Sequence, residues 1–181
     1  SENTIKLTRK LEELTGLPGG QGFTVEAISN AGEVVGYADV EAGIHHAVVW
    51  TQAGAPTDLG IFADRTTLAF DINDAGQVCG LTNFHYHGWR HTPGVGFEDL
   101  GVGFKKRNAS SGAHAINNAG QVAGGSSDGQ FTSEAFRYTD GVGLQNLGTL
   151  GGTSSYCSQS GSINNFGDVV GYSNTSSGSM H

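Results

Sequence analysis

Apolar and polar positions recur in one order four times along this chain. Each copy has an apolar residue, a short turn rich in Asn, Asp and Gly, and then a second apolar run; the copies occupy residues 27–36, 71–80, 115–124 and 162–171. Asn and Asp open such turns by bonding their own backbone, and glycine adopts the left-handed conformation that closes them. Each copy therefore predicts a hairpin of two antiparallel strands.

A second hairpin follows each of the first three copies. Its leading strand is predicted at residues 46–51, 87–92 and 134–139, and a turn containing glycine comes next. Its closing strand ends in the triplets Asp58-Leu59-Gly60, Asp99-Leu100-Gly101 and Asn146-Leu147-Gly148. No helical periodicity separates these segments, so each period holds four short strands.

The spacing of the repeat sets the expected fold. The period is marked by four isoleucines with spacings of 44, 44 and 47 residues, namely Ile28, Ile72, Ile116 and Ile163. Four antiparallel strands in a period of this length are typical of one blade of a β-propeller. We therefore predict a single all-β repeat domain over residues 1–181, a β-propeller with four blades of four antiparallel strands.

The two ends of the chain predict how the propeller closes. Residues 4–20 match the closing strand at 144–152, whereas the last copy of the first hairpin has no second hairpin after it. We therefore expect the N- and C-terminal strands to pair, with blades at 21–62, 63–104 and 105–152 and a composite blade of 153–181 with 1–20. Because Met180-His181 lies where another leading strand would begin, two alternatives stay open: a fragment of a larger propeller, and a ring completed by another subunit.

Several spaced elements resemble the HAF repeat, a family named after its His-Ala-Phe strand. They are the phrase Asn-x-x-Gly-x-Val-x-Gly, the strand His46-Ala47-Val48-Val49-Trp50, and Asn146-Leu147-Gly148-Thr149-Leu150-Gly151-Gly152. Ser29 and Glu134 depart from the pattern. The resemblance covers roughly residues 11–181 and implies a bacterial repeat protein that is secreted and extracellular. It implies no activity, because the family has no defining catalytic residues to transfer.

Composition narrows the range of partners. The formal net charge is −8, and the nine Lys and Arg are scattered apart from Lys105-Lys106-Arg107. Phosphate binding needs a basic face, so we expect no nucleic-acid partner. No apolar run approaches the roughly 20 residues of a membrane span, so we expect no membrane insertion. Cys79 and Cys157 are the only cysteines, and they predict either one disulfide or two buried thiols.

A histidine-rich strand is a weak candidate for metal binding. Residues two apart in a strand share a face, which would place His85, His87 and His91 together, with Trp89 between the last two. Such spacing on a strand can chelate zinc or copper. The same positions carry large apolar groups in the other units, so packing between sheets is the stronger interpretation, and we expect no metal.

The innermost strands hold weak candidates for catalysis, Glu26, Asp71 and His114. These residues could form an acid–base set if they converged on a central channel. Asp71 is offset by one position from the other two, so strand alternation argues against a common face for all three. Ordinary channel polarity, or burial of Glu26 and His114, is the simpler interpretation.

The loops between the second and third strands of each unit differ most in length and content. They span residues 38–45, 82–86, 126–134 and 173–181, on one face of the predicted disc, and carry Tyr86, Phe131 and His85 as candidate binding residues. We expect a non-catalytic module, without a cofactor, that recognises a glycan or a cell-surface partner through this face. Two alternatives stay open: a polysaccharide lyase or hydrolase with its site at the channel mouth, and a structural repeat of an extracellular assembly, as a homo-oligomer.

Overall fold

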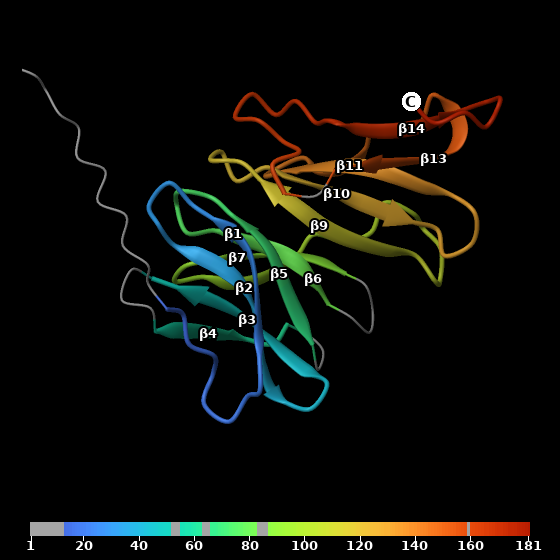
Figure 1. The fold of residues 1–181 in the computed structure, drawn as a ribbon. Coiled ribbons are helices and arrows are strands. Elements are labelled where there is room, and N and C mark those ends of the chain that lie inside the picture. Colours follow the sequence, from blue (N-terminus) through green and yellow to red (C-terminus); the bar gives the residue numbers. More distant parts are fainter. Residues whose placement is uncertain (1–12, 52–54, 63–65, 83–86, 159) are drawn as a thin grey trace, which may run out of the picture.

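The computed structural model describes residues 13–51, 55–62, 66–82, 87–158 and 160–181. These residues form fourteen strands in three sheets, so the predicted all-β class is confirmed (Figure 1). Sheet one contains β1 (Phe23–Ile28), β2 (Val34–Glu41), β3 (Ile44–Trp50) and β4 (Pro56–Gly60). Sheet two contains β5 (Thr67–Ile72), β6 (Val78–Thr82), β7 (Gly88–Thr92) and β8 (Gly96–Asp99).

Sheet three has six strands because a fourth hairpin joins it. The first four are β9 (Ser110–Ile116), β10 (Val122–Ser127), β11 (Ser133–Thr139) and β12 (Gly143–Asn146). The fourth hairpin is made of β13 (Gly151–Cys157) and β14 (Gly171–Thr175). Within each unit consecutive strands pair antiparallel, whereas β13 meets β11 in parallel through the single bridge Ser133–Ser154.

The repeated turn has the structure that its residues predict. In the second copy, Asn73 Oδ1 accepts hydrogen bonds from the main-chain N–H groups of Ala75 and Gln77, at 3.1 and 2.9 Å. Gly76 follows with a φ of 72°, a left-handed conformation that is strained for residues with a side chain. Asn117 and Asn164 make the same bonds in the third and fourth copies.

The core lies between successive sheets. We call the two faces of a sheet incoming and outgoing. The incoming face is the one that packs on the preceding sheet in sheets two and three, and the outgoing face is the one that the next sheet or hairpin covers; the corresponding faces of sheet one and of the fourth hairpin take the same names. Val35 and Ala47 on the outgoing face of sheet one form one buried cluster with the incoming face of sheet two, through Ala69, Ile72, Val78 and Trp89. The outgoing face of sheet two contributes Cys79 to the cluster with sheet three, and the fourth hairpin packs Cys157 and Ile163 on the outgoing face of sheet three.

The predicted propeller closure is wrong. The described residues form three separate open sheets rather than four blades around a channel, and β13–β14 pairs with sheet three and not with sheet one (Figure 1). Closure would have to cover the incoming face of β1 and the outgoing face of the fourth hairpin, yet Ile28 is 67% and Val170, just before β14, is 62% exposed. The alternatives of a larger propeller and of a ring completed by another subunit are also wrong, because the described strands form open sheets of four, four and six strands and not a series of four-stranded blades.

The N-terminal segment also departs from the expected composite blade. Leu14 and Leu17 pack with Ala38, Val48 and Trp50 of sheet one, and Trp50 Nε1 donates a 2.7 Å hydrogen bond to the carbonyl of Thr15. The segment at 4–8, expected to pair with the C-terminal strands, lies outside the described residues.

Among the described residues there is no helix with the length and apolar character to cross a membrane.

Candidate functional site

Three residues at one repeat position line a single cavity. β1, β5 and β9 each carry a one-residue bulge relative to the strand they pair with, and the bulged residues are Glu26, Phe70 and His114. A bulge turns its side chain away from the regular alternation of the strand. Because the three sheets stack in order, these re-aimed side chains meet on one cavity together with Leu81 and Ser160.

The cavity continues into an adjoining groove. The cavity has a volume of about 380 Å³, and the groove of about 200 Å³ shares Leu81 and His114 with it. The groove is also lined by Tyr156 and by five serines, Ser110, Ser111, Ser126, Ser127 and Ser133. Phe70 and His114 meet edge to face with their ring centroids 5.8 Å apart. Ser111 and Ser126 are buried and their hydroxyls are bonded to main-chain groups. The arrangement therefore offers one carboxylate, one imidazole, the hydroxyls of the less buried serines and two aromatic rings to a bound molecule.

Burial keeps the imidazole of this site neutral. It lowers the pKa of His114, because the charged form loses its hydration in the cavity wall. Nδ1 of His114 lies 3.9 Å from Sγ of Cys157. Burial raises the pKa of the Cys157 thiol, so this sulfur is a protonated core group at neutral pH and a poor nucleophile.

The two cysteines do not form the disulfide that was one of their predicted states. Cys79 and Cys157 are both free and buried. Burial, followed by the charge of Asp71, raises the pKa of the Cys79 thiol well above its usual range. Both cysteines therefore act as small apolar core residues, which is the second of the predicted states.

Asp71 lies apart from Glu26 and His114, as its one-residue offset predicts. Its carboxylate accepts main-chain hydrogen bonds from Ile72 at 3.0 Å and from Ile116 at 2.9 Å, and it lines a polar depression of about 420 Å³ between the repeated turns. Ser160 lines both hollows and donates to Asp71 at 3.4 Å. The three weak catalytic candidates are thus split between two sites, and Asp71 links β5 to β9.

Asp71 and Asp128 should affect the pH dependence of stability with opposite signs. Burial raises the pKa of Asp71, so the folded state retains this proton more strongly than the unfolded state, and folding loses free energy as the pH rises from about 4 through the raised pKa. Bonds from Lys106 and from the main chain hold the pKa of Asp128 well below its usual range, so its contribution is present above about pH 4 and is lost on acidification.

Urea unfolding of the wild type, Asp71→Asn and Asp128→Asn between about pH 3 and pH 7 measures these two signs. As the pH rises, the wild type should lose stability relative to Asp71→Asn, because only the wild type has the buried carboxylate to ionise. Over the same range the wild type should gain stability relative to Asp128→Asn. The same sign for both variants would contradict the two assigned environments.

The histidine strand is a structural feature in its described part. Nδ1 of His87 lies 2.8 Å from Oδ2 of Asp99, and His46 meets Asp58 in the same way in sheet one at 2.9 Å. His91 packs edge to face on Phe97, with centroids 4.9 Å apart. Across the described ranges no group of three or more His, Cys, Asp or Glu side chains could hold a metal ion. The twelve-residue spacing of each His and Asp in the sequence is the signal that would have identified these pairs.

Only one of the three predicted loop-face residues is described. His85 and Tyr86 lie outside the described residues, whereas Phe131 is 84% exposed. The buried Asp128 shapes the loop that carries Phe131. One of its oxygens accepts from the main-chain N–H groups of Gln130, Phe131 and Thr132, and the other contacts Lys106 Nζ at 2.6 Å. Phe131 is therefore an isolated aromatic ring on a well-bonded loop.

Phe70, Ser160 and Tyr156 complete the cavity and groove, and they are absent from the predicted site. Phe70 has a signal in the sequence, because it occupies the repeat position of Glu26 and His114. Ser160 and Tyr156 reach the site only through the packing of the fourth hairpin. A comparison with models of protein families found no match to this chain, and a comparison with curated proteins found none either.

Proposed function

We propose that this chain is a non-catalytic binding module that takes a glycan into the cavity of Glu26, Phe70 and His114 and along the serine-lined groove. The observation that carries the proposal is the convergence of three bulged side chains on one hollow. A volume of about 380 Å³ lies within the range of roughly 300–1,000 Å³ usual for small-ligand sites. An extracellular location remains the expectation from the resemblance to the HAF repeat.

The chemistry of the lining suits a sugar better than a charged ligand. Sugar hydroxyls both donate and accept hydrogen bonds, which matches the hydroxyls of Ser110, Ser127 and Ser133, a carboxylate and a neutral imidazole. The apolar face of a sugar ring can pack on Phe70, which lines the cavity, or on Tyr156, which lines the groove. No Lys or Arg is among the described residues that line the cavity and groove, so an anionic group would find no counter-charge.

Binding of neutral oligosaccharides tests this proposal. We expect an array of such oligosaccharides to show binding, and Phe70→Ala to weaken the strongest interaction about tenfold in titration calorimetry, because it removes a stacking surface. Phe131→Ala is the matched control, since it deletes an exposed ring outside the cavity. Thermal melts of both variants separate lost affinity from lost folding.

Two results would overturn the cavity as the glycan site. One is the absence of binding to any oligosaccharide on the array at a concentration where a weak lectin is detected. The other is a reversed ranking, in which Phe131→Ala abolishes binding and a folded Phe70→Ala does not. That ranking would place recognition on the loop face and would fit a glycan or a cell-surface partner held there.

A polysaccharide lyase or hydrolase is the second candidate, favoured by one observation. Glu26 and His114 line the same cavity, and a neutral imidazole can accept a proton. Most glycoside hydrolases need two carboxyl groups across the scissile bond, and Glu26 is the sole carboxylate among the described cavity residues. Release of new sugar ends that is lost in both Glu26→Gln and His114→Ala would replace the binding proposal with this one.

A further inference from the structure

Two halves of a repeated interface are left exposed by the described residues, one on β1 and one on the fourth hairpin; Leu14 and Leu17 cover the part of sheet one around Val48 and Trp50 but leave Ile28 of β1 exposed. Between sheets one and two, the outgoing Val35 is buried in one cluster with the incoming Ala69 and Ile72. Val170 of the fourth hairpin occupies the repeat position of Val35, and it is 62% exposed. On β1, Val25 and Ile28 occupy the positions of Ala69 and Ile72, and Ile28 is 67% exposed.

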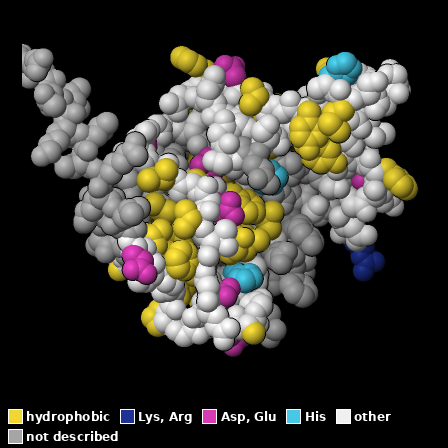
Figure 2. All heavy atoms as spheres, in the orientation of Figure 1, with side chains coloured by type: hydrophobic (Ala, Val, Ile, Leu, Met, Phe, Trp, Pro, Cys, Tyr) yellow, Lys and Arg dark blue, Asp and Glu magenta, His cyan; other side chains and the backbone are white. Residues whose placement is uncertain are grey.

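Aromatic side chains extend the free outgoing face. Tyr156 of β13 and Tyr172 of β14 are partly exposed, with ring centroids 5.3 Å apart. Figure 2 shows apolar side chains gathered at the surface over the region of β13 and β14, at the upper right of the view. Exposed apolar groups concentrated in this way are typical of a surface that another protein covers.

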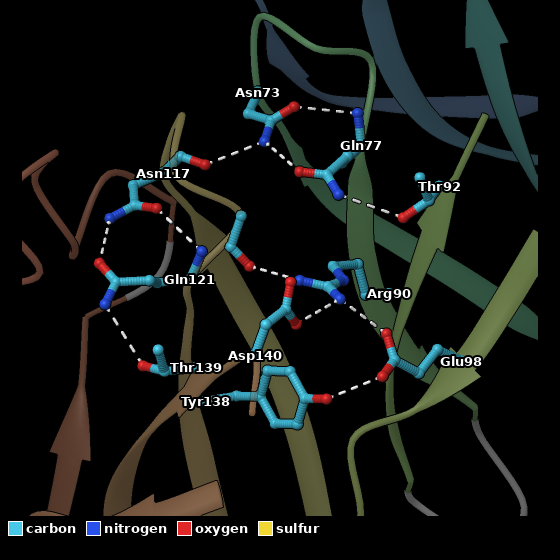
Figure 3. A network of polar contacts seen from close by, with 11 residues as sticks. Asn73, Gln77, Arg90, Thr92, Glu98, Asn117, Gln121, Tyr138, Thr139 and Asp140 are labelled. Atoms are coloured by element: carbon cyan, nitrogen blue, oxygen red, sulfur yellow. Dashed lines mark hydrogen bonds and ion pairs between the residues drawn. The ribbon is translucent and has the colours of Figure 1, made fainter. Parts of the chain in front are cut away.

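A ladder of hydrogen bonds between turns reaches the same two ends. Equivalent residues of successive turns are joined by main-chain N–H donors and side-chain oxygen acceptors: Asn30 to Asp74 at 2.8 Å, Asp74 to Asn118 at 2.9 Å, and Asn118 to Asn165 at 3.0 Å. A second series runs from Asn73 Nδ2 to the carbonyl of Asn117, shown in Figure 3, and from Asn117 Nδ2 to the carbonyl of Asn164.

The ladder ends in complementary groups. The main-chain N–H of Asn165 has no acceptor among the described residues, and Oδ1 of Asn30 has no donor there. Asn164 Nδ2 bonds only within its own turn, to Asp168 at 3.0 Å. The last turn thus offers two donors, the N–H of Asn165 and Nδ2 of Asn164. The first turn offers two acceptors, Oδ1 of Asn30 and the carbonyl of Ser29. The hydrogen bonds within the chain pair the same groups: a main-chain N–H with a side-chain oxygen, and an Asn Nδ2 with a carbonyl.

We propose that copies of this chain associate head to tail, with the outgoing face of β13–β14 in one copy covering the incoming face of β1 in the next. Val170 then packs on Val25 and Ile28 of the second copy, and Asn165 donates to Asn30 of that copy. This contact joins two different faces, so one face stays free at each end of a dimer and further copies can add. It rests on other observations than the glycan proposal, although the two share Tyr156, which lines the groove and also belongs to the outgoing face.

Electrostatics opposes this contact and predicts a salt effect. Each copy carries a formal charge of −8, so two copies repel each other over the distance that ions screen. The contact surface itself is apolar and amide-rich. Association is therefore expected to strengthen when the salt concentration rises from about 50 to about 300 mM. Salt shortens the range of the repulsion between the two charged copies, whereas it has little effect on the burial of apolar groups.

Sedimentation velocity of the full chain tests the proposal. From about 1 to about 500 µM the weight-average mass should rise above 18.7 kDa, and more at the higher salt concentration. Val170→Lys and Ile28→Lys should each raise the dissociation constant about tenfold or more, because each places a charge in the apolar contact. Val95→Lys makes the same charge change at an 84% exposed turn position outside both faces and should associate like the wild type.

A mixing experiment distinguishes the head-to-tail contact from any symmetric one. The Val170→Lys chain keeps its incoming face and the Ile28→Lys chain keeps its outgoing face, so an equimolar mixture should form a dimer of twice 18.7 kDa and nothing larger. A mass of 18.7 kDa under all conditions would overturn the proposal. So would undiminished association of either variant alone, or a mixture that stays monomeric while the wild type associates.

Discussion

Trp89→Ala is expected to lower the free energy of unfolding by about 3–5 kcal/mol, enough to unfold a marginally stable domain. Trp89 is fully buried in the cluster between sheets one and two, and its ring lies against Phe97 at a centroid distance of 5.1 Å. Truncation removes apolar contact with both sheets and leaves a cavity that β-strands, tied by their ladders, cannot collapse to fill. Urea unfolding followed by circular dichroism measures the loss.

Trp89→Phe separates the packing contribution from that of the indole N–H. Nε1 of Trp89 is buried and has no hydrogen-bond partner among the described residues, so its removal carries no hydrogen-bond penalty. The Phe variant should therefore lose much less than the Ala variant. Phe131→Ala, at an 84% exposed position, should stay within about 0.5 kcal/mol of the wild type. Equal losses in Trp89→Ala and Phe131→Ala would contradict the core that the sheet stack assigns.

Strands and turns were predictable because local residues determine them. The Asn that accepts two main-chain bonds and the Gly with a positive φ act within five residues of chain, so each copy of the phrase specifies its own hairpin. How successive sheets pack is a non-local property. In the first interface Val35 and Ala47 pack on Trp89, whereas in the second Cys79 packs with Phe136. Because these side chains differ in size, the two pairs of sheets fit together differently, and the repeat alone does not give their arrangement.

The candidate site was predictable to the extent that the repeat defines it. Alignment of the four copies places Glu26 and His114 at one position and offsets Asp71, and the structure has the same division. The bulge that turns Glu26, Phe70 and His114 into a cavity depends on pairing between strands, which a single sequence does not display. Tyr156 joins the groove through the fourth hairpin, whose attachment to sheet three by one parallel bridge has no signal in the residues.

Gly124→Ala is expected to cost about 3 kcal/mol or more in stability, because no room exists for one methyl group. A Cβ at this position would overlap the carbonyl oxygen of Gly112 in β9 and the ring of Phe136 in β11. A main-chain oxygen cannot move without pulling β9 from β10, and the buried Phe136 ring cannot turn away from its cluster. The same relation of a glycine to a large ring recurs in sheet two, where a Cβ on Gly80 would lie 2.6 Å from Cζ2 of Trp89.

The adjacent glycine gives a matched control for this prediction. A Cβ on Gly125 would meet no atom within 4 Å, and the residue is not in the left-handed region, so Gly125→Ala should be neutral or should stabilise by about 0.5 kcal/mol through a less flexible unfolded chain. The two variants share a strand, a composition and a net charge, and they differ only in the face that receives the methyl group. If urea unfolding gave both the same stability, Phe136 could not be packed over Gly124, and the pairing of β10 between β9 and β11 would be wrong.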